Sequence, residues 1–132
     1  MSSDSNKELV ARFYREVINE QDLDAIDRLL DEDFTHNGER RGRDGQRQAV
    51  EAFLRGFPDL ESEILLLVGE GDLVAAHQRW QGTHRGDFLG VPATGKEVSF
   101  TSTAVLRIRD GQIAEAWDEV DLLGLLTQLR RG

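Results

Sequence analysis

The strongest structural pattern in the chain is the stretch VSFTSTAVLRIRDGQIAEAWDEV, residues 98–120. From 98 to 108, apolar or small side chains occupy every second position, which predicts a long β-strand with one buried face. Asp110-Gly111 follows, a pair favoured in two-residue hairpin turns because both positions need a positive φ. The stretch therefore predicts an antiparallel hairpin whose second strand runs from 112 to 120.

Two further strands are predicted before this hairpin and a short helix after it. Segments 60–69 and 73–83 are rich in β-forming residues, although the leucine run 65–67 interrupts the alternation of the first. Leucines recur at helical spacing over 122–129, and Asp121 stands where it can cap the first turn. The second half of the chain is thus predicted to be an antiparallel meander that ends in a helix.

The first third of the chain is predicted to be helical. Apolar residues at helical spacing indicate helices over 9–18, 23–30 and around 50–54. The segment 56–59, which contains Pro58, ends the third helix. A polar loop from 36 to 45 precedes that helix, and its three arginines are expected to be solvated rather than to bind an anionic substrate.

Three helices followed by a meander indicate an α+β fold, and the length fits a single domain over residues 1–132. The helices can pack on only one face of the sheet, which would curve around them as a cone with a closed pocket in between. The other face must then meet solvent or a second subunit. Trp80 and Trp117 are candidates to cover such a dimer interface, because polar residues occupy the opposite parity of their strands.

Composition and charge exclude several classes of protein. The chain has 25 acidic and 16 basic side chains and a formal net charge of −9, opposite in sign to what a protein that tracks nucleic-acid phosphates needs. The absence of cysteine excludes disulfides, thiol catalysis and cysteine-ligated metals. No secretory signal and no membrane-spanning apolar run is visible. We therefore expect a cytoplasmic protein that binds neither nucleic acid nor membranes.

The motifs indicate no cofactor. His36, His77 and His84 lack the short spacings of metal ligands, and the glycines between 38 and 45 do not follow a strand as a phosphate-binding loop does. We therefore expect no metal and no organic cofactor. His77 alternates with polar neighbours and His84 lies in a predicted turn, so neither is expected in a catalytic role.

Several linked motifs carry a family resemblance. They are GEGDLVAA (69–76), GTHRG (82–86), GVPATGK (90–96), RIRDGQIAE (107–115) and WDEVD (117–121). In order and wording they resemble the SnoaL-like polyketide cyclases, or ester cyclases, of the nuclear-transport-factor-2-like (NTF2-like) superfamily, and the resemblance covers about 9–129. It implies an NTF2-like cone, with three N-terminal helices on a curved antiparallel or mixed sheet and a short C-terminal helix, and it implies a homodimer.

The resemblance also implies a chemistry. Characterised members close a polyketide ring by an intramolecular aldol reaction without metal or cofactor, and a carboxylate in the last strand serves as general acid and base. By motif position that residue is Asp118. Members also tend to carry histidines near the carboxylate, whereas this chain has Ala116 two positions earlier and Ala104 on the neighbouring strand. The proton-transfer residue is thus present while its polar helpers are missing.

The residues around Asp118 favour the same role. Asp118 shares one parity of its strand with Ala114 and Ala116, so its carboxylate would be poorly solvated, and desolvation raises the pKa of a carboxyl group. A carboxyl group that titrates near the working pH can remove a proton and return it. In the alternative, Asp118 caps the terminal helix or pairs with an arginine; for Asp121 the helix cap is the expected role.

Other candidate residues surround the predicted pocket. His36 stands where the helical part meets the basic loop, and its imidazole either assists the carboxylate as a catalytic group or is an exposed loop histidine. Phe88 and Phe100, with Ala104 and Ala116, are predicted to line the pocket and to bind an apolar ligand. Each of these four side chains would also suit the plain core.

The sequence therefore predicts an enzyme that uses Asp118 and His36 for aldol-type acid–base chemistry on a small hydrophobic, polyketide-like carbonyl compound. The missing histidines suggest an alternative, a protein of the same fold that carries a hydrophobic ligand without changing it. An epoxide hydrolase or isomerase is a third possibility. Such a site needs a second carboxylate and an arginine that bracket a water molecule.

Overall fold

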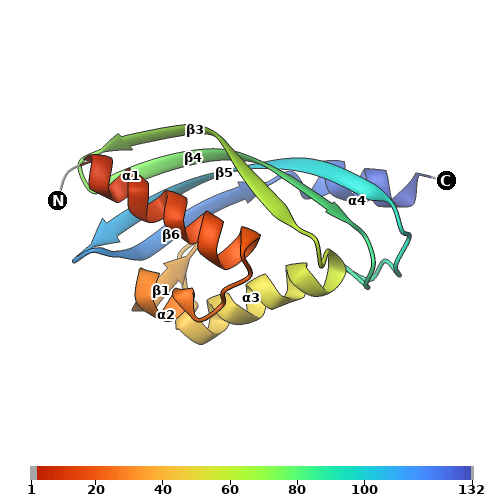
Figure 1. Cartoon of the computed structure of the whole chain (residues 1–132), viewed down its shortest axis with the longest axis horizontal. Coiled ribbons are helices and arrows are strands. Elements are labelled where there is room, and N and C mark those ends of the chain that lie inside the picture. Colours follow the sequence, from red (N-terminus) through yellow and green to blue (C-terminus); the bar gives the residue numbers. More distant parts are fainter. Residues whose placement is uncertain (1–2, 132) are drawn as a thin grey trace.

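A six-stranded mixed sheet forms one layer of the molecule, and helices α1, α2 and α3 lie on one side of it (Figure 1). The computed structural model describes residues 3–131. The strands are β1 Leu30–His36, β2 Glu39–Arg40, β3 Glu61–Glu70, β4 Leu73–Thr83, β5 Glu97–Arg109 and β6 Gln112–Val120. They lie in the order β2-β1-β6-β5-β4-β3, and all neighbours are antiparallel except β1 and β6. The predicted α+β class is confirmed.

The hairpin predicted over 98–120 is confirmed. β5 alternates between exposed and buried residues along nearly its whole length. Asp110 and Gly111 have φ of 52° and 75°, the left-handed conformation that a tight hairpin turn requires at both positions. In β3, the register against β4 shifts between Ile64 and Leu66. The leucine run that interrupted the alternation is therefore a β-bulge, with Leu65 as the extra residue.

The helices are α1 Ser3–Arg12, the π-helix η1 Phe13–Asn19, α2 Ala25–Leu29, α3 Gly42–Gly56 and α4 Leu122–Arg130. The first predicted helix thus begins as an α-helix and continues as a π-helix, whose i→i+5 hydrogen bonds give a wider turn. α3 carries Asp44 in its first turn and Arg55 in its last, charges that suit the helix dipole. None of the helices within 3–131 is both long and apolar enough to cross a bilayer.

The region between the second and third helices differs from the prediction. Leu30, assigned to a helix from its spacing, begins β1, and the expected loop 36–45 contains the end of β1, all of β2 and the start of α3. The cause is tertiary, because Leu30 pairs with Ile113 of β6, far along the chain. Local spacing carries no information about so distant a partner, and the acidic run 31–33 conceals any alternation.

Beyond the end of β6, α4 lies beside β5 and hydrogen-bonds its free edge. Beyond the last β6 residue, Val120, the Gln128 side chain accepts a hydrogen bond from the Ser99 N–H (3.0 Å) and donates one to the Ser99 carbonyl (2.7 Å). The helix itself starts at a cap, because the Gly124 N–H donates to the Asp121 carboxylate at 2.9 Å. The predicted cap at Asp121 is thereby confirmed.

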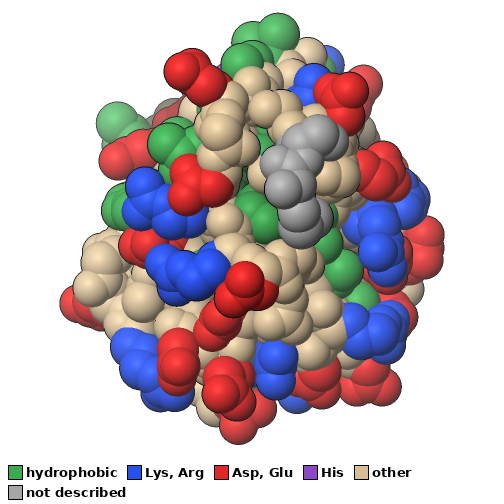
Figure 2. All heavy atoms as spheres, turned by 90° about the vertical axis from the view of Figure 1, so that its left-hand side faces the viewer, with side chains coloured by type: hydrophobic (Ala, Val, Ile, Leu, Met, Phe, Trp, Pro, Cys, Tyr) green, Lys and Arg blue, Asp and Glu red, His purple; other side chains and the backbone are tan. Residues whose placement is uncertain are grey.

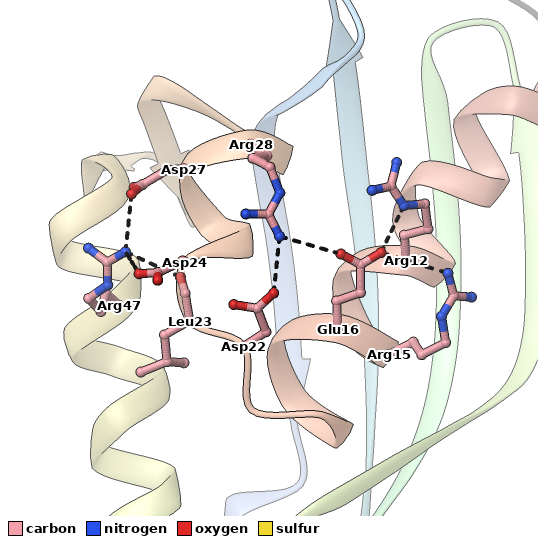
Figure 3. Close-up of polar contacts among 9 residues, drawn as sticks. All are labelled: Arg12, Arg15, Glu16, Asp22, Leu23, Asp24, Asp27, Arg28 and Arg47. Carbon is pink, nitrogen blue, oxygen red and sulfur yellow. Dashed lines mark hydrogen bonds and ion pairs between the residues drawn. The ribbon is translucent and has the colours of Figure 1, made fainter.

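Ion pairs link the helices to one another at the surface (Figure 3). Arg28 of α2 bonds Asp22 at 3.0 Å and lies 3.9 Å from Glu16 of η1, while Arg47 of α3 lies 3.3 Å from Asp27. Exposed pairs are worth about 1 kcal/mol or less, so the buried apolar faces hold the helices in place. Figure 2 shows acidic and basic side chains mixed over this end of the molecule, not gathered into patches of one sign.

The two tryptophans lie on opposite faces of the sheet. Trp80 faces the helices, where its ring stacks on Phe100 at 6.2 Å between centroids and meets Tyr14 edge-on at 6.1 Å. The interface role expected for Trp80 is therefore wrong. Trp117 is 38% exposed on the outer face, with the Arg107 guanidinium 5.5 Å from its ring centroid.

Candidate active site

A cavity of about 420 Å³ lies between the helices and the inner face of the sheet. Much of its wall is aromatic: Phe13, Tyr14, Phe34, Phe53, Trp80 and Phe100. Six polar side chains also line it: His36, Asn37, Arg41, Gln46, Asp118 and Glu119. An apolar cavity with a few polar groups is typical of a site for a small organic molecule.

The π-helix η1 supplies one wall of this cavity through Phe13, Tyr14 and Ile18. π-helical segments are rare and occur often at functional sites. Tyr14 is buried, and this burial, together with the negative charge of Asp118, raises the pKa of its hydroxyl well above the ordinary value. The Tyr14 hydroxyl therefore keeps its proton and can donate a hydrogen bond inside the cavity.

Asp118 has two carboxylate oxygens in different surroundings. Oδ1 is buried and accepts no hydrogen bond from any residue within 3–131, and Oδ2 lies 3.8 Å from Nε2 of His36. A buried acceptor without a partner costs stability, and a bound molecule that donates a hydrogen bond to it would recover that cost. The Asp118 side chain keeps 28% of its exposure and that of His36 keeps 19%, so solvent reaches this end of the cavity.

The pairing of β1 with β6 brings His36 to Asp118. His36 is in register with Ala116, two residues before Asp118 on the neighbouring strand. A histidine thus lies beside Asp118 on a third strand, not at position 116 or 104. At 3.8 Å the two side chains are in contact but too far apart for a hydrogen bond, which leaves room for a polar atom of a ligand to approach both.

Asn37 holds the backbone of Asp118 in place. Its Oδ1 accepts a hydrogen bond from the Asp118 N–H at 2.7 Å, and its Nδ2 donates to the Asp118 carbonyl at 3.3 Å. Its own N–H donates to the Ala116 carbonyl at 2.9 Å. Sequence reasoning missed this residue. The Asn37-Gly38 pair is a hairpin signal that could have indicated the turn, but not the contact with Asp118.

Five of the six predicted site residues line the cavity. These are Asp118, His36, Phe100, Ala104 and Ala116. Phe88 is not among the lining residues: its ring packs 5.0 Å from Phe53 and 5.1 Å from Phe57, between centroids, beneath the cavity wall. The structure thus brings the catalytic candidates together and leaves Phe88 apart. The catalytic and ligand-binding roles of all six stay predictions, as does the closed form of the pocket.

The strand around Asp118 departs from simple alternation. The register between β5 and β6 shifts after Arg107, so Ile113 faces the cavity and Ala114 does not, contrary to the expected parity. The alternative roles considered for Asp118 do not apply, because Asp121 caps α4 and no arginine within 3–131 lies at ion-pair distance from Asp118.

The remaining histidines lie away from this site. His84 is fully buried, with Nδ1 2.9 Å from the Thr94 hydroxyl oxygen, and His77 Nδ1 lies 2.7 Å from the Thr103 hydroxyl oxygen. Across the described range 3–131, no three histidine or acidic side chains gather where they could hold a metal ion.

Comparison with known proteins finds relatives over nearly the whole chain. The family described as SnoaL-like polyketide cyclase matches residues 8–129. Aklanonic acid methyl ester cyclase DnrD of Streptomyces peucetius and its counterpart DauD of Streptomyces sp. strain C5 are each 34% identical to this chain over 95 residues, 71% of its length. The chain spans less than two thirds of these relatives, 66% of DnrD and 59% of DauD.

Solved structures show the same fold. TsrD from Streptomyces laurentii superposes with a TM-score of 0.89 at 34% identity, and the match covers 98% of each chain. The open six-stranded sheet and the helices on its inner face correspond to the NTF2-like cone expected from the sequence motifs.

Proposed function

The chain belongs to the SnoaL-like polyketide cyclase family, and we propose that it is a cofactor-independent, cyclase-type enzyme acting on a small, largely apolar carbonyl compound. The observation that supports this most is the Asp118 carboxylate, which has an unpaired buried oxygen in an aromatic-walled cavity and lies beside His36. DnrD and DauD are named as methyl ester cyclases, which agrees with a reaction that closes a ring within one molecule.

The proposed reaction is an intramolecular aldol addition. The Asp118 carboxylate removes a proton from the carbon next to a carbonyl group, leaving an enolate. The enolate carbon attacks a second carbonyl carbon of the same molecule, forming the ring carbon–carbon bond and an alkoxide. The alkoxide takes the proton back from the Asp118 carboxylic acid, so atoms and charge balance without a co-reactant.

Two neighbours are proposed to assist. Asn37 keeps the Asp118 backbone fixed through its two hydrogen bonds, so the carboxylate does not have to be oriented during the reaction. His36 is proposed to hydrogen-bond a substrate oxygen, or to move into hydrogen-bond distance of Asp118 when the ligand binds, since catalytic contacts often tighten only in the complex.

The first experiment measures proton removal directly and does not need the natural substrate. Aryl ketones and diketones are incubated with the protein in D₂O, and exchange of the protons next to the carbonyl is followed by NMR. Asp118→Asn should slow exchange by about 10²–10⁴-fold, the usual contribution of a positioned base. Asp121→Asn is the matched control, because Asp121 caps α4 outside the cavity lining. Exchange within a few-fold of wild type in Asp118→Asn would overturn the proposal.

A carrier protein without chemistry is the second candidate. Its support is the pair Ala104 and Ala116, which flank Asp118 where family members tend to carry histidines. The carrier predicts an unchanged, co-purifying hydrophobic ligand and no exchange that depends on Asp118. The exchange experiment therefore separates the two candidates.

We also propose a homodimer formed through the outer face of the sheet. Val68, Ala75, Val105 and Trp117 pair in that order across four strands. They form an apolar stripe, in which Val68 is 61% exposed. A two-fold dimer needs such a surface to be complementary to itself. Light scattering should give twice the chain mass; a monomer at micromolar concentration would reject the dimer.

A further inference from the structure

Arg41 differs from the arginines around it in what it contacts. Each of its neighbours has a firm protein partner: Arg40 bonds Asp33, Arg43 donates to the Leu30 carbonyl, and Arg47 pairs with Asp24 and Asp27. Within residues 3–131, no carboxylate lies at ion-pair distance from Arg41, whose side chain donates only to Oε1 of Gln46, at 2.9 Å. Arg40 is exposed, as expected for the loop arginines, whereas Arg41 is half-buried and lines the cavity.

The position of Arg41 is fixed from two sides. Its backbone N–H donates to the Phe34 carbonyl of β1 at 2.9 Å, and Gln46, one turn into α3, holds one terminal nitrogen of the guanidinium. Arg41 and Gln46 both line the cavity. A guanidinium group has five N–H donors, so Gln46 leaves most of them available to a bound molecule.

Two carboxylates act on the charge of Arg41, and only one of them, Asp118, lines the cavity. Burial lowers the pKa of the guanidinium, and the negative charges of Asp118 and Glu39 raise it in part. Glu39 is exposed and does not line the cavity, whereas Asp118 does. Arginine stays charged at any usable pH. When Asp118 takes up a proton, Arg41 keeps its positive charge and loses the partial compensation that the Asp118 carboxylate provided.

We propose that Arg41 is the group that binds the anionic oxygen of the bound compound, the enolate oxygen that forms when Asp118 accepts the proton. This inference rests on the proposed function, because it assigns Arg41 to the enolate of that reaction. The negative charge moves from Asp118 to the substrate oxygen, and a cation fixed in advance stabilises it there without reorganising. Gln46 acts as a positioning residue for the guanidinium.

The test uses benzoylacetone, an aromatic 1,3-diketone whose enolate absorbs differently from its neutral forms. Binding is followed by fluorescence of Trp80 and Trp117, and the acid dissociation constant of the bound probe is measured by absorbance against pH. Wild-type protein should raise that constant relative to the free probe, because a nearby cation favours the charged form. Arg41→Gln should lower it at least about tenfold from the wild-type value, and Arg41→Lys should restore part of the difference.

Two controls make the result specific. Arg40→Gln removes the same charge from an arginine that bonds Asp33 outside the cavity lining, and should leave the constant unchanged. Gln46→Leu keeps the charge but releases the guanidinium, and should give a smaller loss than Arg41→Gln. Circular dichroism verifies that each variant is folded.

The outcomes separate this inference from the function on which it rests. If wild-type protein neither binds the probe nor exchanges its protons, both the function and the inference fail. If the protein binds and exchanges the probe but Arg41→Gln leaves the acid constant unchanged, only the role of Arg41 is overturned. An equal loss in Arg40→Gln would also overturn it, by showing that distant charge and not contact is responsible.

Discussion

The inner and outer faces of the sheet are made from alternate residues of the same strands, yet the inner face borders a cavity and the outer face carries an apolar stripe. On the inner face, Ala76 pairs with Ala104 and Ala104 with Asp118, so a row of small side chains leads to the carboxylate and leaves room for the cavity. On the outer face, the stripe of Val68, Ala75, Val105 and Trp117 is apolar and partly exposed. The size and polarity of the side chains on each face therefore decide which face borders the cavity and which carries the apolar stripe.

Filling the inner face should have the largest effect. Ala104→Phe would place a ring beside Asp118, and we expect at least 100-fold weaker binding of aryl ketones, measured by tryptophan fluorescence. Overpacking should also lower the free energy of unfolding by about 1–3 kcal/mol.

Thr103→Val, one residue away on the outer face, is the control for this change. It should leave binding within about twofold, because Thr103 contacts His77 outside the cavity. Equal loss of binding in both variants would show that the loss does not depend on which face of β5 carries the substitution.

Removing the two hydrogen bonds between the Asn37 side chain and the Asp118 backbone should have the next largest effect. Asn37→Ala leaves the Asp118 N–H and carbonyl without their side-chain partner, and we expect about tenfold slower proton exchange with about 1–2 kcal/mol lower stability.

The chain offers a matched control for Asn37→Ala. Asn19 makes the same two hydrogen bonds to Ser62 of β3, accepting from its N–H at 2.8 Å and donating to its carbonyl at 3.1 Å. Asn19→Ala should therefore lose similar stability while keeping the exchange rate. If both variants lose the same exchange activity, Asn37 contributes only to folding.

A charge on the outer face should change assembly and leave the chemistry intact. Val68→Lys places a cation in the apolar stripe, and we expect the light-scattering mass to fall from two chains to one. Exchange should stay within about twofold of wild type, because Val68 lies across the sheet from the cavity. Loss of exchange together with the dimer would mean that the site depends on the partner.

The smallest effect is expected at Asp59, where neither face is involved. The Thr83 N–H and hydroxyl each donate to the Asp59 carboxylate at 2.7 Å and lower its pKa. A folded-state pKa below the unfolded value of about 3.9 stabilises the protein above that pH. This stabilisation is lost as the pH falls through the folded value.

Asp59→Asn should accordingly lower the free energy of unfolding by about 1 kcal/mol at pH 7, and by less at pH 3. Urea denaturation at the two pH values measures the difference. An equal cost at both would show that the charge of Asp59 does not contribute.

The regions that sequence reasoning predicted well are those with local causes. The β5–β6 hairpin follows from alternation and from a turn pair that tolerates positive φ, and the Asp121 cap follows from its place before the leucine run. β1 was missed because its residues do not alternate and its partner in the sheet is β6, so nothing near it in the sequence indicates a strand. Phe88 was assigned to the pocket from its aromatic character, which does not distinguish a cavity wall from the packing behind it.

The sequence by itself determined the α+β class, the hairpin, the family resemblance and Asp118 as the candidate carboxylate, since period and turn chemistry act over a few residues and the order of motifs is read directly along the chain. Only the tertiary structure placed His36 and Asn37 against Asp118, with Asn37 and Asp118 81 positions apart. It also distinguished Arg41 from its neighbours. Arginines close together in a sequence look alike. They differ only in the folded chain, where Arg40 and Arg47 have carboxylate partners and Arg41 lines the cavity.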